Sequence, residues 1–171
     1  MNVVFSLTVP HFDRSLGNLE RWVDKAFDFA KDKKFDANDL LTARLAPDQY
    51  PLLRQVQTSC DTAKLTCARL AGKDVPVHAD TEKTWEELLT RIRSVREIVN
   101  GFTPADLEGA EAKEIKLPWK GDKVISGIDY LSGFALPNFA FHLTHAYAIL
   151  RHNGVALGKL DFIGTLPFRD A

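Results

Sequence analysis

Four stretches of the chain repeat apolar residues every three or four positions, the spacing that buries one face of an α-helix. The clearest repeat follows Asp80 or Thr81, either of which can cap a helix start. The other stretches carry the same spacing, so the pattern predicts four long helices. Their expected ranges are His11 to Lys33, Pro47–Pro51 to Gly72, Asp80 or Thr81 to Phe102, and Ser126 to Asn153–Gly154.

Residues that favour helix ends support several of these boundaries. Proline at 47 and 51 suits a first helical turn, and Gly72 suits a helix end. Ser126 and Asp129 have the spacing of a capping box. Pro137 falls inside the last helix and predicts a kink, because it leaves the Gly133 carbonyl without its usual N–H partner.

The connections between these helices show other patterns. Residues 36–45 predict one or two short turns opened by Asp36 or Asn38. Residues 114–119 alternate, and residues 123–125 could pair with them across a turn, so a small hairpin or an extended excursion is expected. The tail, residues 155–171, is expected to pack as an extended strap over the helices.

These elements favour an all-α fold, a four-helix bundle with a short hairpin or extended crossover before the last helix. A chain of 171 residues fits one domain spanning residues 1–171, and 45% apolar content is ordinary globular usage. We therefore expect one hydrophobic core that needs no disulfide or metal in order to fold.

The charge balance narrows the expected partners. Twenty-two basic and 23 acidic residues give no electrostatic reason to expect nucleic acid or an anionic membrane. The apolar runs are too short to span a bilayer, and residues 1–10 lack the basic start of a signal peptide. Cys60 and Cys67 would lie about 10 Å apart on one helical stripe, too far for a disulfide. Reduced interior cysteines predict a cytoplasmic protein.

The last helix carries the candidate chemistry. Successive residues turn by about 100°, which places Asn138, His142, His145 and His152 in one narrow stripe of an otherwise apolar helix. A buried imidazole without a partner costs about 1–3 kcal/mol, so these groups need partners. His142 and His145 alone supply two metal ligands, fewer than the three typical of zinc. His152 suits a helix C-terminus by its charge alone.

The second helix could complete a site. Gln57 and Asp61 lie one turn apart, and Asp61 could bind a divalent metal or orient a histidine. Alternatively, Asp61 and Lys64 belong to a solvated flank of that helix. No glycine-rich phosphate loop or Gly-x-Ser-x-Gly motif is present in the sequence, and neither cysteine adjoins a histidine.

Several segments together resemble a known family. The chain is similar to an uncharacterised bacterial family, a domain of unknown function within the DinB/YfiT-like superfamily, whose members are classed as metalloenzymes. The resemblance covers nearly the whole chain, and its most specific part is the last helix. The segments are residues 43–50 (ARLAPDQY), Gln55 to Gln57, Cys60–Asp61, Gly109 to Glu111, Phe134 to Phe139 and Ala148 to Gly154.

The resemblance implies a four-helix bundle, often dimeric. It also implies a divalent metal, commonly nickel or zinc, held by one histidine of the second helix and a His-x-x-x-His pair of the last helix. His142 matches the second histidine of that pair, whereas Asn138 occupies the place of the first. Residues 47–72 contain no histidine, and Gln57 and Asp61 are the nearest candidates.

We therefore predict a DinB-like bundle protein with a polar pocket and a degenerate metal site, which binds a small molecule of unknown identity. The alternative is a divalent-metal-dependent hydrolase or thiol transferase that uses nickel, zinc or iron. A homodimer is compatible with Trp22 and Phe29, which the first helix leaves outside its stripe. The predicted ligand-binding residues are Asn138, His142, His145, Gln57 and Asp61, and the predicted metal ligands are His142, His145 and Asp61.

Overall fold

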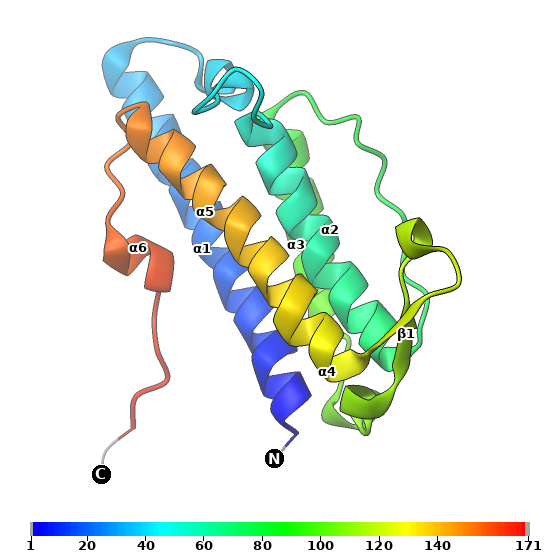
Figure 1. The fold of residues 1–171 in the computed structure, drawn as a ribbon. Coiled ribbons are helices and arrows are strands. Elements are labelled where there is room, and N and C mark those ends of the chain that lie inside the picture. The colour runs from blue at the N-terminus through cyan, green and yellow to red at the C-terminus, as the bar shows by residue number, and fades with distance from the viewer. Residues whose placement is uncertain (1, 170–171) are drawn as a thin grey trace.

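Four helical rods lie side by side in the computed structural model, which describes residues 2–169 (Figure 1). α3 packs against both α1 and α2, and α5 packs mainly against α2. No helix within residues 2–169 is long and apolar enough to cross a membrane. The expected all-α four-helix bundle is confirmed. The rods are α1 (Val3–Lys33), α2 (Leu52–Ala71), α3 (Trp85–Asn100), and a fourth built from α4 (Gly127–Tyr130), a π-helical turn (Leu131–Ala135) and α5 (Leu136–His152).

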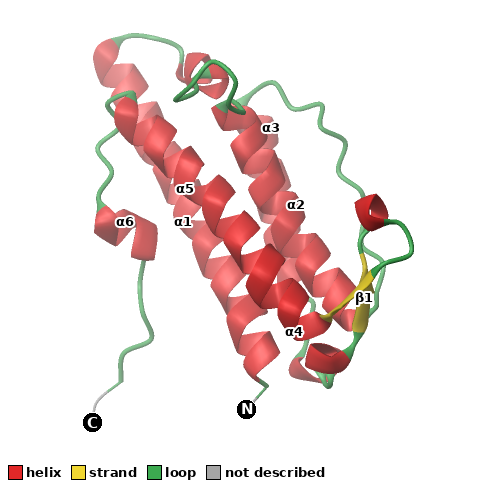
Figure 2. Cartoon of the chain, in the orientation of Figure 1, coloured by secondary structure: helices red, strands yellow, loops and turns green. Residues whose placement is uncertain are grey.

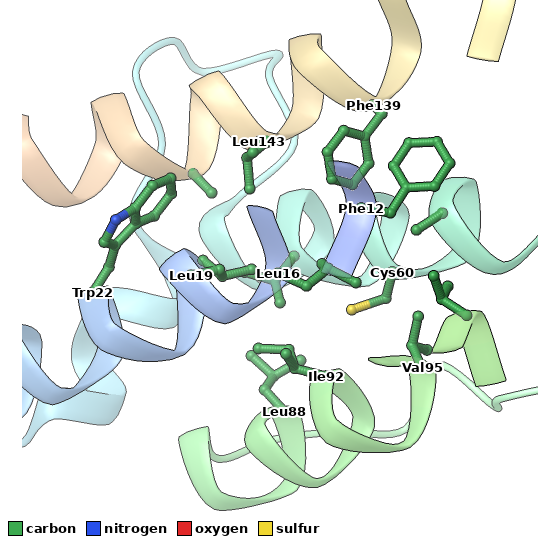
Figure 3. Close-up of a cluster of buried hydrophobic side chains, with 14 of the residues drawn as sticks. Phe12, Leu16, Leu19, Trp22, Cys60, Leu88, Ile92, Val95, Phe139 and Leu143 are labelled. Atoms are coloured by element: carbon green, nitrogen blue, oxygen red, sulfur yellow. The ribbon is translucent and has the colours of Figure 1, made fainter. Parts of the chain in front are cut away.

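Apolar side chains from all four rods meet in one core (Figure 3). The rings of Phe12 and Phe139 pack edge to face across it, with centroids 4.7 Å apart. Cys60 and Cys67 are buried and unpaired, as expected, and burial raises the pKa of each thiol to about 12. The core side chains labelled in Figure 3 are Phe12, Leu16, Leu19, Trp22, Cys60, Leu88, Ile92, Val95, Phe139 and Leu143.

Short elements connect the rods (Figure 2). The Asp36 carboxylate accepts from the Asn38 amide and opens a 3₁₀ helix, Ala37–Thr42. Strands β1 (Glu114–Lys116) and β2 (Val124–Ser126) pair antiparallel, so the predicted hairpin is confirmed. Two 3₁₀ turns precede the hairpin, at Pro104–Leu107 and Ala110–Ala112, and another, Pro118–Lys120, lies between its strands.

The first helix begins earlier than its pattern predicted. It starts at Val3, capped by the Asn2 side chain, and not at His11. Pro10 lies inside the helix, where it removes one backbone donor. Val4 and Val9, both in the part of the helix that precedes Pro10, are buried. Their packing on the core offsets the lost bond, which the sequence pattern alone did not show.

The third helix begins later than expected. Thr84 caps it in a capping box with Glu87, whose carboxylate accepts from the Thr84 amide at 3.1 Å. Neither Asp80 nor Thr81 is the cap. Asp80 instead bonds Arg91 of α3, and this tertiary ion pair competes with its local capping role.

The interruption predicted at Pro137 takes the form of the π-helical turn. The Leu136 amide donates to the Leu131 carbonyl, five residues back. Pro137 has no N–H to donate to Gly133, so the wider turn lies where the α-helical pattern loses a bond. Ser126 caps the rod through the Asp129 amide, as its spacing predicted.

The C-terminal tail differs from the expected extended strap, because it contains a short helix, α6 (Lys159–Ile163). The Trp22 indole donates to the Asp161 carbonyl at 3.1 Å, and the Phe162 ring stacks on Trp22. α6 therefore packs on α1, and Trp22 is buried and not available for the dimer face that the sequence permitted.

Candidate functional site

The side chain of His142 lies between α5 and α2 and is 8% exposed. Its Nδ1 atom is 2.7 Å from Oε1 of Gln55. The Gln55 amide nitrogen donates to the Tyr50 carbonyl at 3.1 Å, which turns Oε1 towards the histidine. An amide oxygen can only accept, so the proton of His142 sits on Nδ1 and its Nε2 atom carries a free lone pair.

The charge state of His142 follows from its surroundings. Burial lowers its pKa to about 4, with smaller contributions from His145 and Arg54. The ring is therefore neutral near pH 7, because its pKa lies well below that value. A neutral ring with Nδ1 already bonded presents Nε2 as a hydrogen-bond acceptor or a metal ligand.

Aromatic side chains surround this ring at the protein surface. The Tyr50 ring stacks nearly parallel to it, with centroids 6.4 Å apart, and the Phe141 ring meets it edge on at 5.2 Å. Tyr50 and Phe141 are about half exposed, and the Arg54 guanidinium lies 5.9 Å from the Tyr50 ring centroid. We call Tyr50, Arg54, Gln55, Phe141 and His142 the His142 face.

The other two residues of the predicted stripe bond differently. The Asn138 amide donates to Thr62 Oγ1 of α2 at 2.8 Å. His145 bonds to the backbone of its own helix, α5, because its Nδ1 atom is 2.7 Å from the Phe141 carbonyl oxygen. The structure thus places Asn138 and His142 against α2, and leaves His145 half-buried beside Phe141.

Gln57 and Asp61 do not join the histidines. Gln57 donates to Glu82 Oε2 at 2.9 Å, and Asp61 Oδ1 lies 2.9 Å from Arg91 Nη2 of α3. The reason is helical geometry. Gln55 and Thr62 are seven residues apart and share the side of α2 that faces α5, whereas Gln57 and Asp61 point about 120–160° away from Gln55.

On that other side of α2 lies a group of charged residues that we call the Arg91 cluster: Asp61, Lys64, His78, Asp80, Glu82 and Arg91. The Arg91 side chain is almost fully buried, and its Nη1 atom lies 2.9 Å from both Asp80 Oδ1 and Glu82 Oε1. Burial raises the pKa of each of these two carboxyls. The hydrogen bonds from Arg54 and Arg91 to Asp80, and from Arg91 to Glu82, outweigh it, so both pKa values are lowered.

Lys64 and His78 attach the α2–α3 connection to this cluster. Lys64 Nζ lies 2.7 Å from His78 Nδ1 and 3.1 Å from Asp61 Oδ1. An ammonium can only donate, so His78 holds its proton on Nε2, 3.1 Å from Ser94 Oγ. Burial, Lys64 and Arg91 lower the pKa of His78. Lys64 is buried, so it is not part of the solvated flank considered from the sequence, and His78 is half-buried.

The predicted metal ligands are not brought together. His142 and His145 lie on α5, whereas Asp61 pairs with Arg91 and Lys64 across α2. Within residues 2–169, no three His, Cys, Asp or Glu side chains gather as a metal site requires. The side chains that the structure describes therefore do not fit the three-ligand centre that the resemblance implies.

Reasoning from the sequence missed Gln55, which orients His142, and Arg91, which holds the charged cluster. A signal for Gln55 was present, because Gln55, Ser59, Thr62 and Thr66 recur at helical spacing and are all buried. Arg91 had none, since its position in the third repeat resembles that of any exposed charge.

Comparisons with known proteins agree with this fold. No curated protein matches the chain in sequence. A crystal structure of a DinB family member from Shewanella denitrificans matches with a TM-score of 0.94 and 45% identity, over 98% of this chain and 95% of that one. A family model described as a domain of unknown function, DUF1993, matches residues 4–163. The chain therefore belongs to the DUF1993 family, with the helical bundle of a DinB family member.

Proposed function

We propose that this protein binds a small polar molecule at the His142 face. The observation that carries the proposal is the hydrogen-bond chain from the Tyr50 carbonyl through Gln55 to His142 Nδ1. One buried side chain, Gln55, holds the imidazole in one tautomer, and burial keeps the ring neutral. Such an arrangement prepares Nε2 to accept a hydrogen bond from a ligand.

The neighbouring side chains supply the other contacts that a small molecule needs. Tyr50 and Phe141 present exposed aromatic surface on two sides of the ring, against which an apolar or planar ligand can pack. Arg54 contributes a positive charge at the edge and is itself held by Asp80. A ligand with a hydroxyl or N–H donor beside a planar group fits this face best.

A fragment screen observed by NMR tests the proposal. Phenols, amides and heteroaromatic fragments are titrated while the ¹⁵N signals of the His142 ring are followed. Saturable binding that shifts Nε2, weakens at least tenfold in His142→Ala and persists in His152→Ala would support it. His152 is a fair control because it lies on the same helix, fully outside the face. Fragments that bind equally well to both variants would contradict it.

A divalent-metal-dependent enzyme is the second candidate. Its support is that histidines which bind metals have their other ring nitrogen held by an acceptor, as Gln55 holds His142 and the Phe141 carbonyl holds His145. Two imidazoles fall short of three protein ligands, which places this candidate second. Elemental analysis of untagged protein tests it. About one nickel, zinc or iron per chain, lost in His142→Ala, would favour it over the first.

A further inference from the structure

A concave site separate from the His142 face lies between α1, α3 and the C-terminal tail. The cavity measures about 420 Å³, within the usual range for a small-molecule site. We call it the arginine cleft, because three guanidinium groups and one carboxylate line it. Its lining residues are Asp13, Arg14, Gly17 and Arg21 of α1, Arg96 of α3, and Thr165 to Pro167 of the tail.

The tail forms one wall of this cleft because α6 is held on α1. The Asn18 amide donates to the Phe162 carbonyl at 2.8 Å, beside the Trp22 bond to Asp161. At Gly164 the backbone has φ of +71° and passes so close to Asn18 that a Cβ atom would overlap that side chain. Glycine therefore lets the chain turn here and continue along α1.

Gly17 forms part of the floor. A Cβ atom at this position would lie 3.2 Å from Arg96 Cζ and 3.3 Å from Arg96 Nη2. The guanidinium of Arg96 thus lies directly over the helix backbone. Glycine is unfavourable inside a helix, so its presence in the middle of α1 fits a position where another group approaches closely.

The donors of Arg96 are only partly used. Nε donates to Asp13 Oδ1 at 2.8 Å, and Nη1 donates to Glu20. A guanidinium has five N–H donors, and among residues 2–169 the Nη2 group of Arg96 has no hydrogen-bond partner. Neither carboxylate accepts from Nη2, which lies over Gly17 and keeps its donors for a ligand.

The other two arginines have no carboxylate partner among the described residues. Arg21 donates to the Asn18 side-chain oxygen, and Arg14 makes no ion pair or side-chain hydrogen bond within residues 2–169. Even after Asp13 and Glu20 are counted against the three arginines, positive charge remains in excess. A concave site with excess guanidinium groups attracts anions.

We propose that the arginine cleft binds the oxyanion of a small molecule, either a phosphate ester or a carboxylate. Arg14 and Arg21 are seven residues apart and therefore lie on the same side of α1, and Arg96 Nη2 lies over Gly17 in the floor. Guanidinium groups donate in pairs to phosphate or carboxylate oxygens, so this arrangement can surround such a group from more than one direction. The proposal is independent of the His142 face, which shares no residue with it.

The test is an NMR titration of the arginine Nε–H signals at constant ionic strength. Inorganic phosphate, phenyl phosphate and malonate serve as probes. We expect saturable shifts of the Arg14 and Arg96 signals, and at least tenfold weaker binding in Arg14→Gln/Arg21→Gln. Tighter binding of the two phosphates than of malonate assigns the site to phosphate esters, and the reverse assigns it to carboxylates.

Two further variants keep the result interpretable. Arg44→Gln is the matched control, because Arg44 is exposed in the α1–α2 connection and outside the cleft. Thr165→Glu adds a carboxylate to the exposed wall without touching the helices, and should also weaken binding at least tenfold. Shifts that do not saturate, or that Arg44→Gln reduces as much as the double variant does, overturn the proposal.

Discussion

The two sides of α2 hold polar groups in opposite ways. On the side facing α5, Gln55 and His142 form a neutral chain that ends in a free acceptor. On the side facing α3, Arg91 binds carboxylates from three positions, and its charges are balanced within the protein. The comparison teaches that buried polarity alone does not mark a site. The side that presents a free imidazole nitrogen beside exposed aromatic rings is the candidate for binding. The side whose charges are paired within the protein is structural.

The largest expected effect on stability comes from removing Arg91, on the side of α2 that faces α3. Arg91→Ala should lower the free energy of unfolding by about 3–5 kcal/mol, because it leaves grouped carboxylates without their buried partner. Arg93→Ala is the control. Its guanidinium is exposed and pairs only with Glu20, so a loss of about 0.5 kcal/mol is expected. Urea denaturation measures both, and equal losses would show that the cluster is not structural.

The hydrogen bond between Gln55 and His142, on the side of α2 that faces α5, should contribute less to stability. His142→Ala leaves Gln55 Oε1 buried without a donor, so a loss of about 1–3 kcal/mol in unfolding free energy is expected. His145→Ala should cost less than about 0.5 kcal/mol, since its ring bonds only its own helix backbone. A His142→Ala variant as stable as wild type would mean that the hydrogen-bond chain is not formed in solution.

The pH dependence of stability separates the contribution of the histidines from that of the carboxylates. The native pKa of His142, about 4, lies below the ordinary value of 6.5, so between those values the unfolded state binds more protons. Stability therefore falls as pH drops from about 6.5 to 4, and His142→Gln should flatten this slope. His78, whose pKa is also lowered, contributes in the same direction.

The carboxylates of the Arg91 cluster act at lower pH. The pKa values of Asp80 and Glu82 are lowered from 3.8 and 4.5, so their stabilisation is present above those values and is lost as pH falls below them. Denaturation curves recorded between pH 7 and pH 3 should show two ranges of loss. If His142→Gln changed only the loss of stability at the lower pH, the assignment of the upper range to His142 would be wrong.

The smallest expected effect on stability is at Asn138, which lies one turn before His142 on α5. Asn138→Ala removes one hydrogen bond to Thr62 from a half-buried position and should cost about 0.5–1 kcal/mol. Thermal unfolding measures it. Fragment binding at the His142 face should not change in this variant, whereas a lost fragment site would extend the face to Asn138.

Much of the fold could be predicted from local patterns. The repeats located four helices, Gly72 and Asn153 marked ends, and Ser126 marked a cap, because each signal acts through neighbours within one or two turns. The predictions failed where distant groups compete with local ones. Packing of Val4 and Val9 extended α1 through Pro10, and Arg91 drew Asp80 away from capping α3.

The residues of the candidate site could likewise be predicted only where a local pattern marked them. Asn138, His142 and His145 could be picked from the sequence because a polar stripe on an apolar helix is visible in spacing alone. Gln57 and Asp61 were chosen for their chemistry. Their side chains turn towards α3 instead, since side chains two and six residues after Gln55 point to other sides of a helix.

The sequence by itself determined the helical bundle and the polar stripe of its last helix, because helical periodicity is a property of consecutive residues. Only the tertiary structure decided which nitrogen of His142 carries the proton, which side of α2 is charged, and that the tail lies beside three arginines. Each of these depends on which residues distant in the chain meet. That is settled by how whole helices pack and not by any local pattern.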